Sequence, residues 1–478
     1  QLGTASLWID EVWTQLSTEG SIHQTIVRTL ELGNQTPVYF LILHLFPRDT
    51  DFLLRLPSVL FGIIGVALVM LVALRLYKDY NFALLAGALF AFNPYFIWLS
   101  RTARYYSLLF IFSLLASYYF LVLLRNDRNR RVWTLFVLSS MAAYMTHYFA
   151  AANPLAQYVL FSFLLSRKRR FFRRWMVAQM IAVLPLLVWM ILLSQQEVLS
   201  IGIGWIPKPS WKDPIQTLWD MTVGYDGGVR LDGSIRWYVP FGLVAAVIGL
   251  AVGIYDALQN RRTNHINLFW FWLMVAPLVL VFVLSVALRS LYVDRYFVVV
   301  LPAILLLILV GWQRLSRIRK GLGTVLAAIF IIVNLLNVFV TLNRDENHVQ
   351  DWRSAAAYVT EEQQPGDALL FEMPVDLIAF TRYFDSVDME RAWLLDADIQ
   401  EQFDQPVQRV WVIYRNPVAD VHRQGVAPAF DPFAKHDSPL YGWIRDHRAG
   451  VVSSAQKEFN GIIVLLVETG DEFARGEQ

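Results

Sequence analysis

The sequence contains no cysteine, which excludes disulfides, thiolate metal sites and a cysteine nucleophile. Charged residues are also scarce, at 17% of the 478 residues, against about 25% in an ordinary soluble domain. The 41 basic and 39 acidic residues nearly cancel, so no excess of positive charge favours nucleic acid as a partner. We also find no Walker loop, no nucleophile elbow and no zinc-ligand spacing.

Hydrophobic residues, in contrast, make up 56% of the chain and are concentrated in long runs. A helix needs about 20 residues to cross the apolar core of a bilayer, and many of these runs approach or reach that length. We therefore predict a polytopic α-helical membrane protein. Spanning helices are predicted near residues 53–76, 82–100, 105–124, 132–148, 150–165, 176–194, 237–256, 267–288, 293–312 and 322–342.

The basic residues of the connecting loops indicate how these helices are oriented. The external face of the plasma membrane is predicted to carry residues 1–52, the loop 195–236 and everything after Asn343. The run 37–46 is too short to span, and we expect it to lie along the surface with the amphipathic stretch after Ser21. These segments are assigned to the external face because basic residues are typical of cytoplasmic loops, which lie on the opposite side. They collect in alternate loops, at 75–78, 125–131, 167–174, 261–262 and 314–320.

The chain is expected to have three parts: a first external loop with interfacial helices (1–52), a transmembrane helical domain (53–342) and a small external domain (343–478). The last part alternates short apolar runs with helical stretches such as 351–362, which is typical of an α/β fold. Asp396-Ala397-Asp398 has the spacing of metal-binding carboxylates but is interpreted as a solvated turn. Strands are predicted at 368–371, 410–414 and 462–467.

Two adjacent carboxylates, Asp10 and Glu11, lie near the start of the chain beside Trp8. Carboxylates held at a membrane surface are costly to desolvate, which favours a functional role. The alternative is that they form only the polar end of a membrane helix. Arg101 and Arg104 begin a predicted span on the same external face. Two arginines three residues apart on one helix face would clamp an anion such as phosphate, whereas a single arginine there would be interpreted as snorkelling.

Two further polar groups are predicted at the same face. His147 ends one span, and a lone histidine there is either a base or a hydrogen-bonded structural residue. Arg295 follows Asp294 at the start of a later span, and this pair makes either a salt bridge or a phosphate contact. A carboxylate with guanidinium groups at a lipid–water boundary suits transfer from a lipid phosphate. The carboxylate would take a proton from the acceptor, and the arginines would hold the leaving phosphate.

Several short motifs, taken in order, resemble the GT-C glycosyltransferases. Trp8-Ile9-Asp10-Glu11, Gln35-Thr36-Pro37-Val38-Tyr39 and Arg55-Leu56-Pro57-Ser58 look like the first external loop and next span of that superfamily. The most similar members are protein O-mannosyltransferase-like and aminoarabinose-transferase-like enzymes, which use polyprenyl-phosphate sugars. The resemblance covers most of residues 7–365. Further motifs similar to bacterial members are Ser100 to Ser107, Thr146-His147-Tyr148, Arg295-Tyr296-Phe297 and Asp351-Trp352-Arg353.

This resemblance implies a GT-C fold and a glycosyltransferase activity. It implies that one sugar passes, with inversion at the anomeric carbon, from a polyprenyl-phosphate donor to a lipid, glycan or protein acceptor. The reaction would take place on the outer face of the plasma membrane. The predicted site comprises the catalytic carboxylates Asp10 and Glu11, the phosphate-binding residues Arg101, Arg104 and Arg295, and the pocket residues Tyr39, Tyr105 and His147.

No residue is predicted to bind a metal, and we leave open whether a divalent metal ion takes part, since some relatives hold one. Relatives begin with a membrane helix before the acidic loop, so we expect such a helix to precede Gln1. A transporter or flippase of lipid-linked sugars would also explain charged residues in the membrane, although no matched pair of Gly/Pro-broken spans supports it. A polymerase or ligase of lipid-linked glycans would differ mainly in using a pyrophosphate-linked donor.

Overall fold

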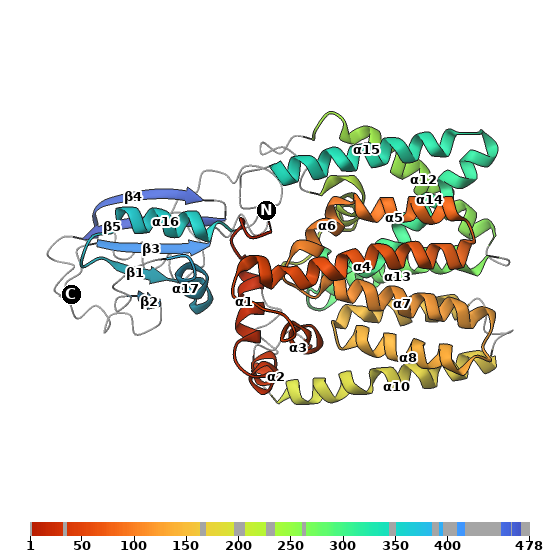
Figure 1. Cartoon of the computed structure of the whole chain (residues 1–478), viewed down its shortest axis with the longest axis horizontal. Coiled ribbons are helices and arrows are strands. Elements are labelled where there is room, and N and C mark those ends of the chain that lie inside the picture. The colour runs from red at the N-terminus through yellow and green to blue at the C-terminus, as the bar shows by residue number, and fades with distance from the viewer. Residues whose placement is uncertain are drawn as a thin grey trace.

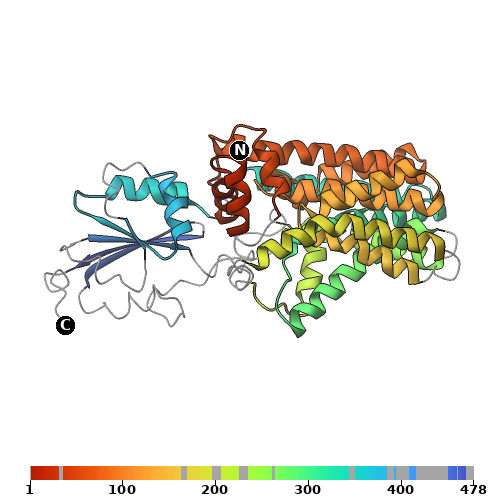
Figure 2. The same ribbon diagram turned by 90° about the horizontal axis from the view of Figure 1, so that it is seen from below.

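The chain forms a helical bundle with a smaller sheet domain at one end of it (Figure 1). Three short helices, α1 (Ile9–Thr18), α2 (Ile22–Glu31) and α3 (Val38–Leu43), lie between these two parts, and Figure 2 shows the same arrangement from below. The computed structural model describes residues 2–31, 36–162, 169–195, 206–225, 235–260, 264–343, 350–384, 392–394, 409–415, 451–459 and 461–469.

The bundle contains the long apolar helices that the sequence predicts. Its helices are α4 (Asp51–Tyr77), α5 (Tyr80–Ala91), α6 (Pro94–Arg101), α7 (Tyr106–Arg125), α8 (Arg130–Tyr144), α9 (Ala152–Ser162), α10 (Arg169–Ser194), α12 (Val239–Gln259), α13 (His265–Ala287), α14 (Leu301–Ile318) and α15 (Leu322–Asn343). Within the described ranges, seven helical segments are long and apolar enough to cross a membrane, or eight if the bent α5–α6 pair is one span. The predicted polytopic helical fold is therefore confirmed.

Three of the predicted spans differ from the structure. The run 82–100 is broken at Asn93-Pro94, and α5 and α6 meet there at 60°. Proline has no N–H with which to continue a helix, and the Asn93 side chain caps α6 by accepting a hydrogen bond from Phe96 N. Helices α8 and α9, with 15 and 11 residues, are shorter than the runs 132–148 and 150–165 and than the roughly 20 residues of a full span.

Helix α14 lies at the centre of the bundle. Every residue from Leu301 to Trp312 is buried, and the helix follows directly on the 3₁₀ segment η5 (Asp294–Val300). Glycines allow α14 to approach α12 closely, because a Cβ on Gly311 would lie 1.9 Å from the Gly249 carbonyl oxygen. This packing fixes the position of η5, which carries Arg295. Three shorter segments complete the bundle: η1 (Tyr148–Ala151), α11 (Asp213–Trp219) and the π-helical turn η3 (Asp220–Gly224).

The C-terminal domain joins helices α16 (Trp352–Glu362) and α17 (Pro374–Thr381) to a five-stranded sheet in the order β2-β1-β3-β5-β4. Strand β1 pairs in parallel with β2 and β3, whereas β5 is antiparallel to β3 and β4. The predicted helix and all three predicted strands are confirmed, and Asp396 and Asp398 lie outside the described residues. The strands are β1 (Ala368–Phe371), β2 (Ala392–Leu394), β3 (Arg409–Arg415), β4 (Val451–Phe459) and β5 (Ile462–Thr469).

Candidate active site

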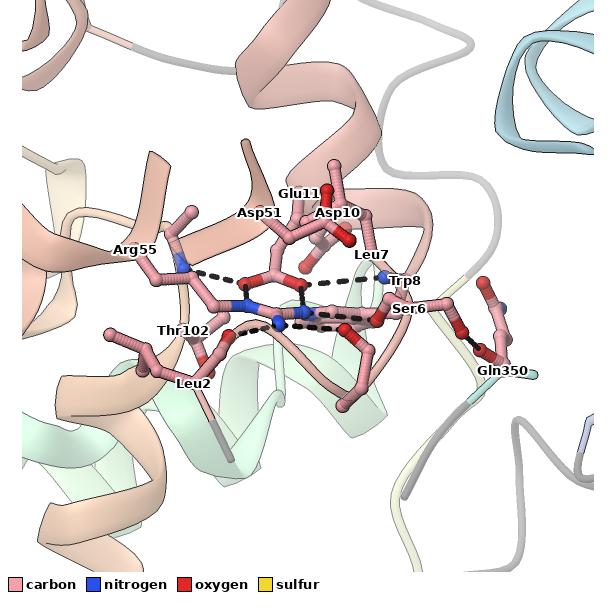
Figure 3. Close-up of polar contacts among 12 residues, drawn as sticks. Leu2, Ser6, Leu7, Trp8, Asp10, Glu11, Asp51, Arg55, Thr102 and Gln350 are labelled. Atoms are coloured by element: carbon pink, nitrogen blue, oxygen red, sulfur yellow. Dashed lines mark hydrogen bonds and ion pairs between the residues drawn. The ribbon is translucent and has the colours of Figure 1, made fainter. Parts of the chain in front are cut away.

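The two carboxylates at the start of the chain lie in the first turn of α1, at the end of the bundle that faces the C-terminal domain. Helix α1 begins at Ile9, so Asp10 and Glu11 are its second and third residues. Acidic side chains are favourable there because the N-terminus of a helix carries a partial positive charge. Successive helical residues point about 100° apart, so the two carboxylates face different partners, and Figure 3 shows those of Glu11.

Glu11 is buried, with 1% of its surface exposed, and it forms an ion pair with Arg55 of α4. Arg55 donates from Nε to Oε1 at 2.8 Å and from Nη2 to Oε2 at 2.6 Å, which is the bidentate geometry that a guanidinium favours. The backbone N–H groups of Ala103 and Trp8 also donate to this carboxylate, at 2.7 and 3.4 Å. Glu11 thus joins α1, α4 and the link between α6 and α7 (Figure 3).

Arg55 also fixes the segment that precedes α1. Its Nη1 donates to the carbonyl oxygens of Leu2 and Ala5, and its Nη2 donates to that of Ser6, all at 2.8–2.9 Å. One buried guanidinium therefore holds three carbonyl groups of the N-terminal arm as well as Glu11. The sequence analysis includes Arg55 only as part of a motif and predicts no role for it. The available signal was an arginine inside an otherwise apolar span, which is rare without a partner.

Asp10, in contrast, keeps 18% of its side chain exposed. Its Oδ2 lies 3.3 Å from Nη2 of Arg295, and the Arg295 guanidinium carbon lies 5.3 Å from the centre of the Trp8 ring. Arg295 comes from η5, directly before the central helix. Of the two adjacent carboxylates, Asp10 is therefore the one that a second molecule can reach.

Arg104 lies on the other side of the same helix turn. Its Nη1 donates to the backbone oxygen of Asp10 at 3.0 Å and to Oγ1 of Thr14 at 3.3 Å. The residue is buried, with 3% exposed, and its Nε has no hydrogen-bond partner among the described residues. The Tyr106 hydroxyl is likewise buried without a partner in that part of the chain. Unused donors beside two guanidinium groups suit an anionic ligand.

The predicted pair of arginines does not share a helix face. Helix α6 ends at Arg101, and an irregular link separates it from the start of α7 at Tyr106. Arg101 lines a cleft with Trp8, Trp98 and residues from the end of α15, whereas Arg104 is not among the residues that line it. The predicted clamp required one continuous helix through 100–107, and the break after Arg101 rules that helix out.

A buried group of aromatic rings lies next to Arg104 and consists of Tyr39, Tyr105 and His147. The Tyr105 and His147 rings stack with centroids 4.5 Å apart, and the Tyr39 ring lies 6.4 Å from that of Tyr105. Tyr39 is also tied to Arg104 through Ser58, whose hydroxyl lies 2.8 Å from the Tyr39 hydroxyl and donates to the Arg104 carbonyl oxygen. The structure brings the three predicted pocket residues together.

His147 is uncharged in this environment. Burial lowers its pKa from the ordinary value to about 3, and the nearby charges of Arg104 and Arg295 act in the same direction. Its Nδ1 accepts a hydrogen bond from Phe149 N at 3.2 Å, so the proton of the neutral ring is on Nε2. Among the described residues, no three His, Asp or Glu side chains are grouped as a metal site. Gln35 of the second motif lies outside the described ranges.

Comparison with known proteins agrees with this architecture. Residues 34–193 match the family model described as dolichyl-phosphate-mannose-protein mannosyltransferase, a range that includes Arg104 and His147 but not Asp10. The fold is that of the GT-C membrane glycosyltransferases, and the family match over the first part of the bundle agrees with it.

Among solved structures, the chain is similar to ArnT from Cupriavidus metallidurans. The apo form of that protein matches with a TM-score of 0.59 at 14% sequence identity, and the form bound to undecaprenyl phosphate matches with 0.59 at 13%. Each match covers 100% of this chain and 96% of the other. At this level of identity the likeness establishes the fold. No curated protein matches the chain in sequence.

Proposed function

We propose that the protein transfers a single sugar from a polyprenyl-phosphate donor to a hydroxyl of a lipid, glycan or protein acceptor. The observation that carries this proposal is the placement of two guanidinium groups at Asp10: Arg295 lies 3.3 Å from its accessible carboxylate, and Arg104 donates to its backbone oxygen. Two guanidinium groups suit a phosphate because each offers a planar set of donors. The ArnT structure with bound undecaprenyl phosphate and the mannosyltransferase family match support a lipid-phosphate donor.

In the proposed reaction, the Asp10 carboxylate takes the proton of the acceptor hydroxyl. The acceptor oxygen forms a bond to the anomeric carbon while the bond from that carbon to the phosphate oxygen breaks, with inversion. The electron pair of the broken bond leaves with polyprenyl phosphate, whose charge lies beside Arg104 and Arg295. Donors that are already in place stabilise such developing charge with little reorganisation.

The role that we propose for Glu11 differs from the catalytic role that is predicted from the sequence. Both of its oxygens accept hydrogen bonds from Arg55 and backbone N–H groups, which leaves the carboxylate poorly placed to accept a substrate proton. We assign Glu11 to positioning: it fixes the turn that carries Asp10.

We place the site and the C-terminal domain outside the plasma membrane, because the loops between α7 and α8 and between α14 and α15 are basic.

The proposed function is tested by incubating the purified protein with a synthetic polyprenyl-phosphate sugar and a range of hydroxyl acceptors. Covalent transfer with release of polyprenyl phosphate, detected by mass spectrometry, is the expected result. Transfer only from pyrophosphate-linked glycans would favour the polymerase or ligase. Movement of the lipid-linked sugar across a vesicle membrane without transfer would favour the flippase.

Replacing Arg104 by alanine should weaken donor binding about 10- to 100-fold. A hydrogen bond to a charged group contributes about 1.5–3 kcal/mol, and about 1.4 kcal/mol corresponds to a tenfold change in affinity. Arg104→Lys should recover part of the loss, since lysine keeps the charge but lacks the planar fork. The measurement is donor affinity by calorimetry in nanodiscs, with folding checked by thermal melting.

The matched control is Arg128→Ala, which removes an exposed arginine at the opposite end of α7 and should leave donor affinity unchanged. A folded Arg104→Ala variant that binds the donor as tightly as the parent would remove Arg104 from the phosphate site.

A further inference from the structure

The residues just before Asp10 are held by the C-terminal domain as well as by the bundle. Gln350, which lies just before that domain's first helix and is 1% exposed, accepts a hydrogen bond from Ile9 N through its side-chain Oε1 at 2.9 Å. Its carbonyl oxygen accepts from the Ser6 hydroxyl at 2.8 Å (Figure 3). The first N–H groups of a helix have no partner within the helix, so Gln350 supplies one to the first residue of α1.

A second contact comes from Tyr383, which follows α17. Its hydroxyl accepts from Leu7 N and donates to Oδ2 of Asp51, each at 2.8 Å. Asp51, the first residue of α4, is in turn paired with Arg382 and Arg353, at 2.7 and 2.9 Å. The Tyr383 hydroxyl thus joins the N-terminal arm, the bundle and the C-terminal domain at one point.

Apolar packing joins the same three parts. Leu7 and Val12 lie in the acidic segment, residues 6–12, and are 0 and 1% exposed. They belong to one buried cluster with Trp352 and Phe380 of the C-terminal domain. Leu54 of α4 contributes to this cluster as well. The core of the C-terminal domain therefore continues into the segment that carries Asp10, and the domain cannot shift without moving that segment.

We propose that Gln350 and Tyr383 are positioning residues for Asp10, so that the C-terminal domain completes the active site. This inference rests on the proposed function. Gln350 fixes the backbone one residue before Asp10, and Tyr383 fixes it three residues before. Arg55, through its ion pair with Glu11, and Arg104 fix the same turn from the bundle. Misplacement of a catalytic group by about 1 Å can reduce turnover about 10²-fold, so a loosened turn lowers kcat even where the donor still binds.

The test uses the full-length variants Gln350→Met and Tyr383→Phe, which remove the accepting oxygens and keep side chains of similar size. We expect kcat for sugar transfer to fall about 10- to 100-fold while the KM for the donor changes less than about threefold. Gln363→Met and Tyr358→Phe make the same replacements within α16 or directly after it. Neither contacts the acidic segment through a described hydrogen bond, and both should behave like the parent.

Hydrogen exchange of residues 6–12 gives a readout that does not depend on activity. Exchange should be faster in Gln350→Met and Tyr383→Phe than in the parent and the two controls. Unchanged exchange with unchanged kcat would overturn the inference, as would a loss of kcat matched by an equal loss of donor binding. If the parent transferred no sugar but exchange still increased, the proposed function would fail while the structural coupling stood.

Discussion

Replacing Asp10 by asparagine should lower turnover by roughly 10²- to 10⁴-fold, which is the usual contribution of a positioned general base. Asparagine has nearly the same shape and keeps an oxygen that faces Arg295, but it does not accept a proton. The backbone oxygen of residue 10, which accepts from Arg104, is unaffected. Donor binding should therefore survive while the chemical step is lost. Single-turnover transfer and donor affinity, measured on the same preparation, separate the two effects.

Asp49→Asn is the matched control, because Asp49 is an exposed carboxylate in the loop just before α4, at the same end of the bundle. It should transfer sugar at the parental rate. Normal turnover in a well-folded Asp10→Asn variant would remove the carboxylate from the mechanism. The proposed donor would then depend on the arginines and the comparisons alone.

Replacing Glu11 by glutamine should strongly destabilise the folded protein. It leaves the Arg55 guanidinium buried without its carboxylate, and breaking a buried ion pair in this way costs about 3–5 kcal/mol. The amide nitrogen of glutamine would also face one set of the N–H groups that now donate to Glu11. The free energy of unfolding in detergent, from denaturant titration, is the measurement.

Glu19→Gln supplies the comparison, since Glu19 directly follows α1 and pairs with Arg28 at 3.7 Å on the surface, where both side chains are more than a third exposed. Exposed pairs contribute about 0–1 kcal/mol, so this change should be nearly silent. Equal stability of the Glu11→Gln and Glu19→Gln variants would mean that the Glu11–Arg55 pair does not hold the N-terminal arm in place.

Neighbouring residues of one motif are therefore expected to perform different tasks. Asp10 is partly exposed and faces Arg295, whereas Glu11 is enclosed and faces Arg55. Asp10→Asn should reduce activity with little loss of stability, and Glu11→Gln should reduce both, because the turn that carries Asp10 is then poorly fixed. This contrast distinguishes a base from a positioning carboxylate.

The amino-acid sequence alone determined the membrane fold, because the thickness of the bilayer sets the length of an apolar run without reference to other parts of the chain. The helix 351–362 and the strands 368–371, 410–414 and 462–467 could also be predicted, since they depend on short-range patterns. The same reasoning selected Asp10, Arg104 and Arg295, which the structure brings together. Their catalytic and binding roles stay predictions.

Only the tertiary structure decided which carboxylate is accessible and which is enclosed. Asp10 and Glu11 are adjacent and chemically alike, and their environments differ because Arg55 comes from 44 residues away and Arg295 from the other half of the chain. The separation of Arg101 from Arg104 depended on where α6 ends, and the proposed role of Gln350 depends on a contact 341 residues away. Such contacts arise from how helices pack in space, and no local pattern in the sequence encodes them.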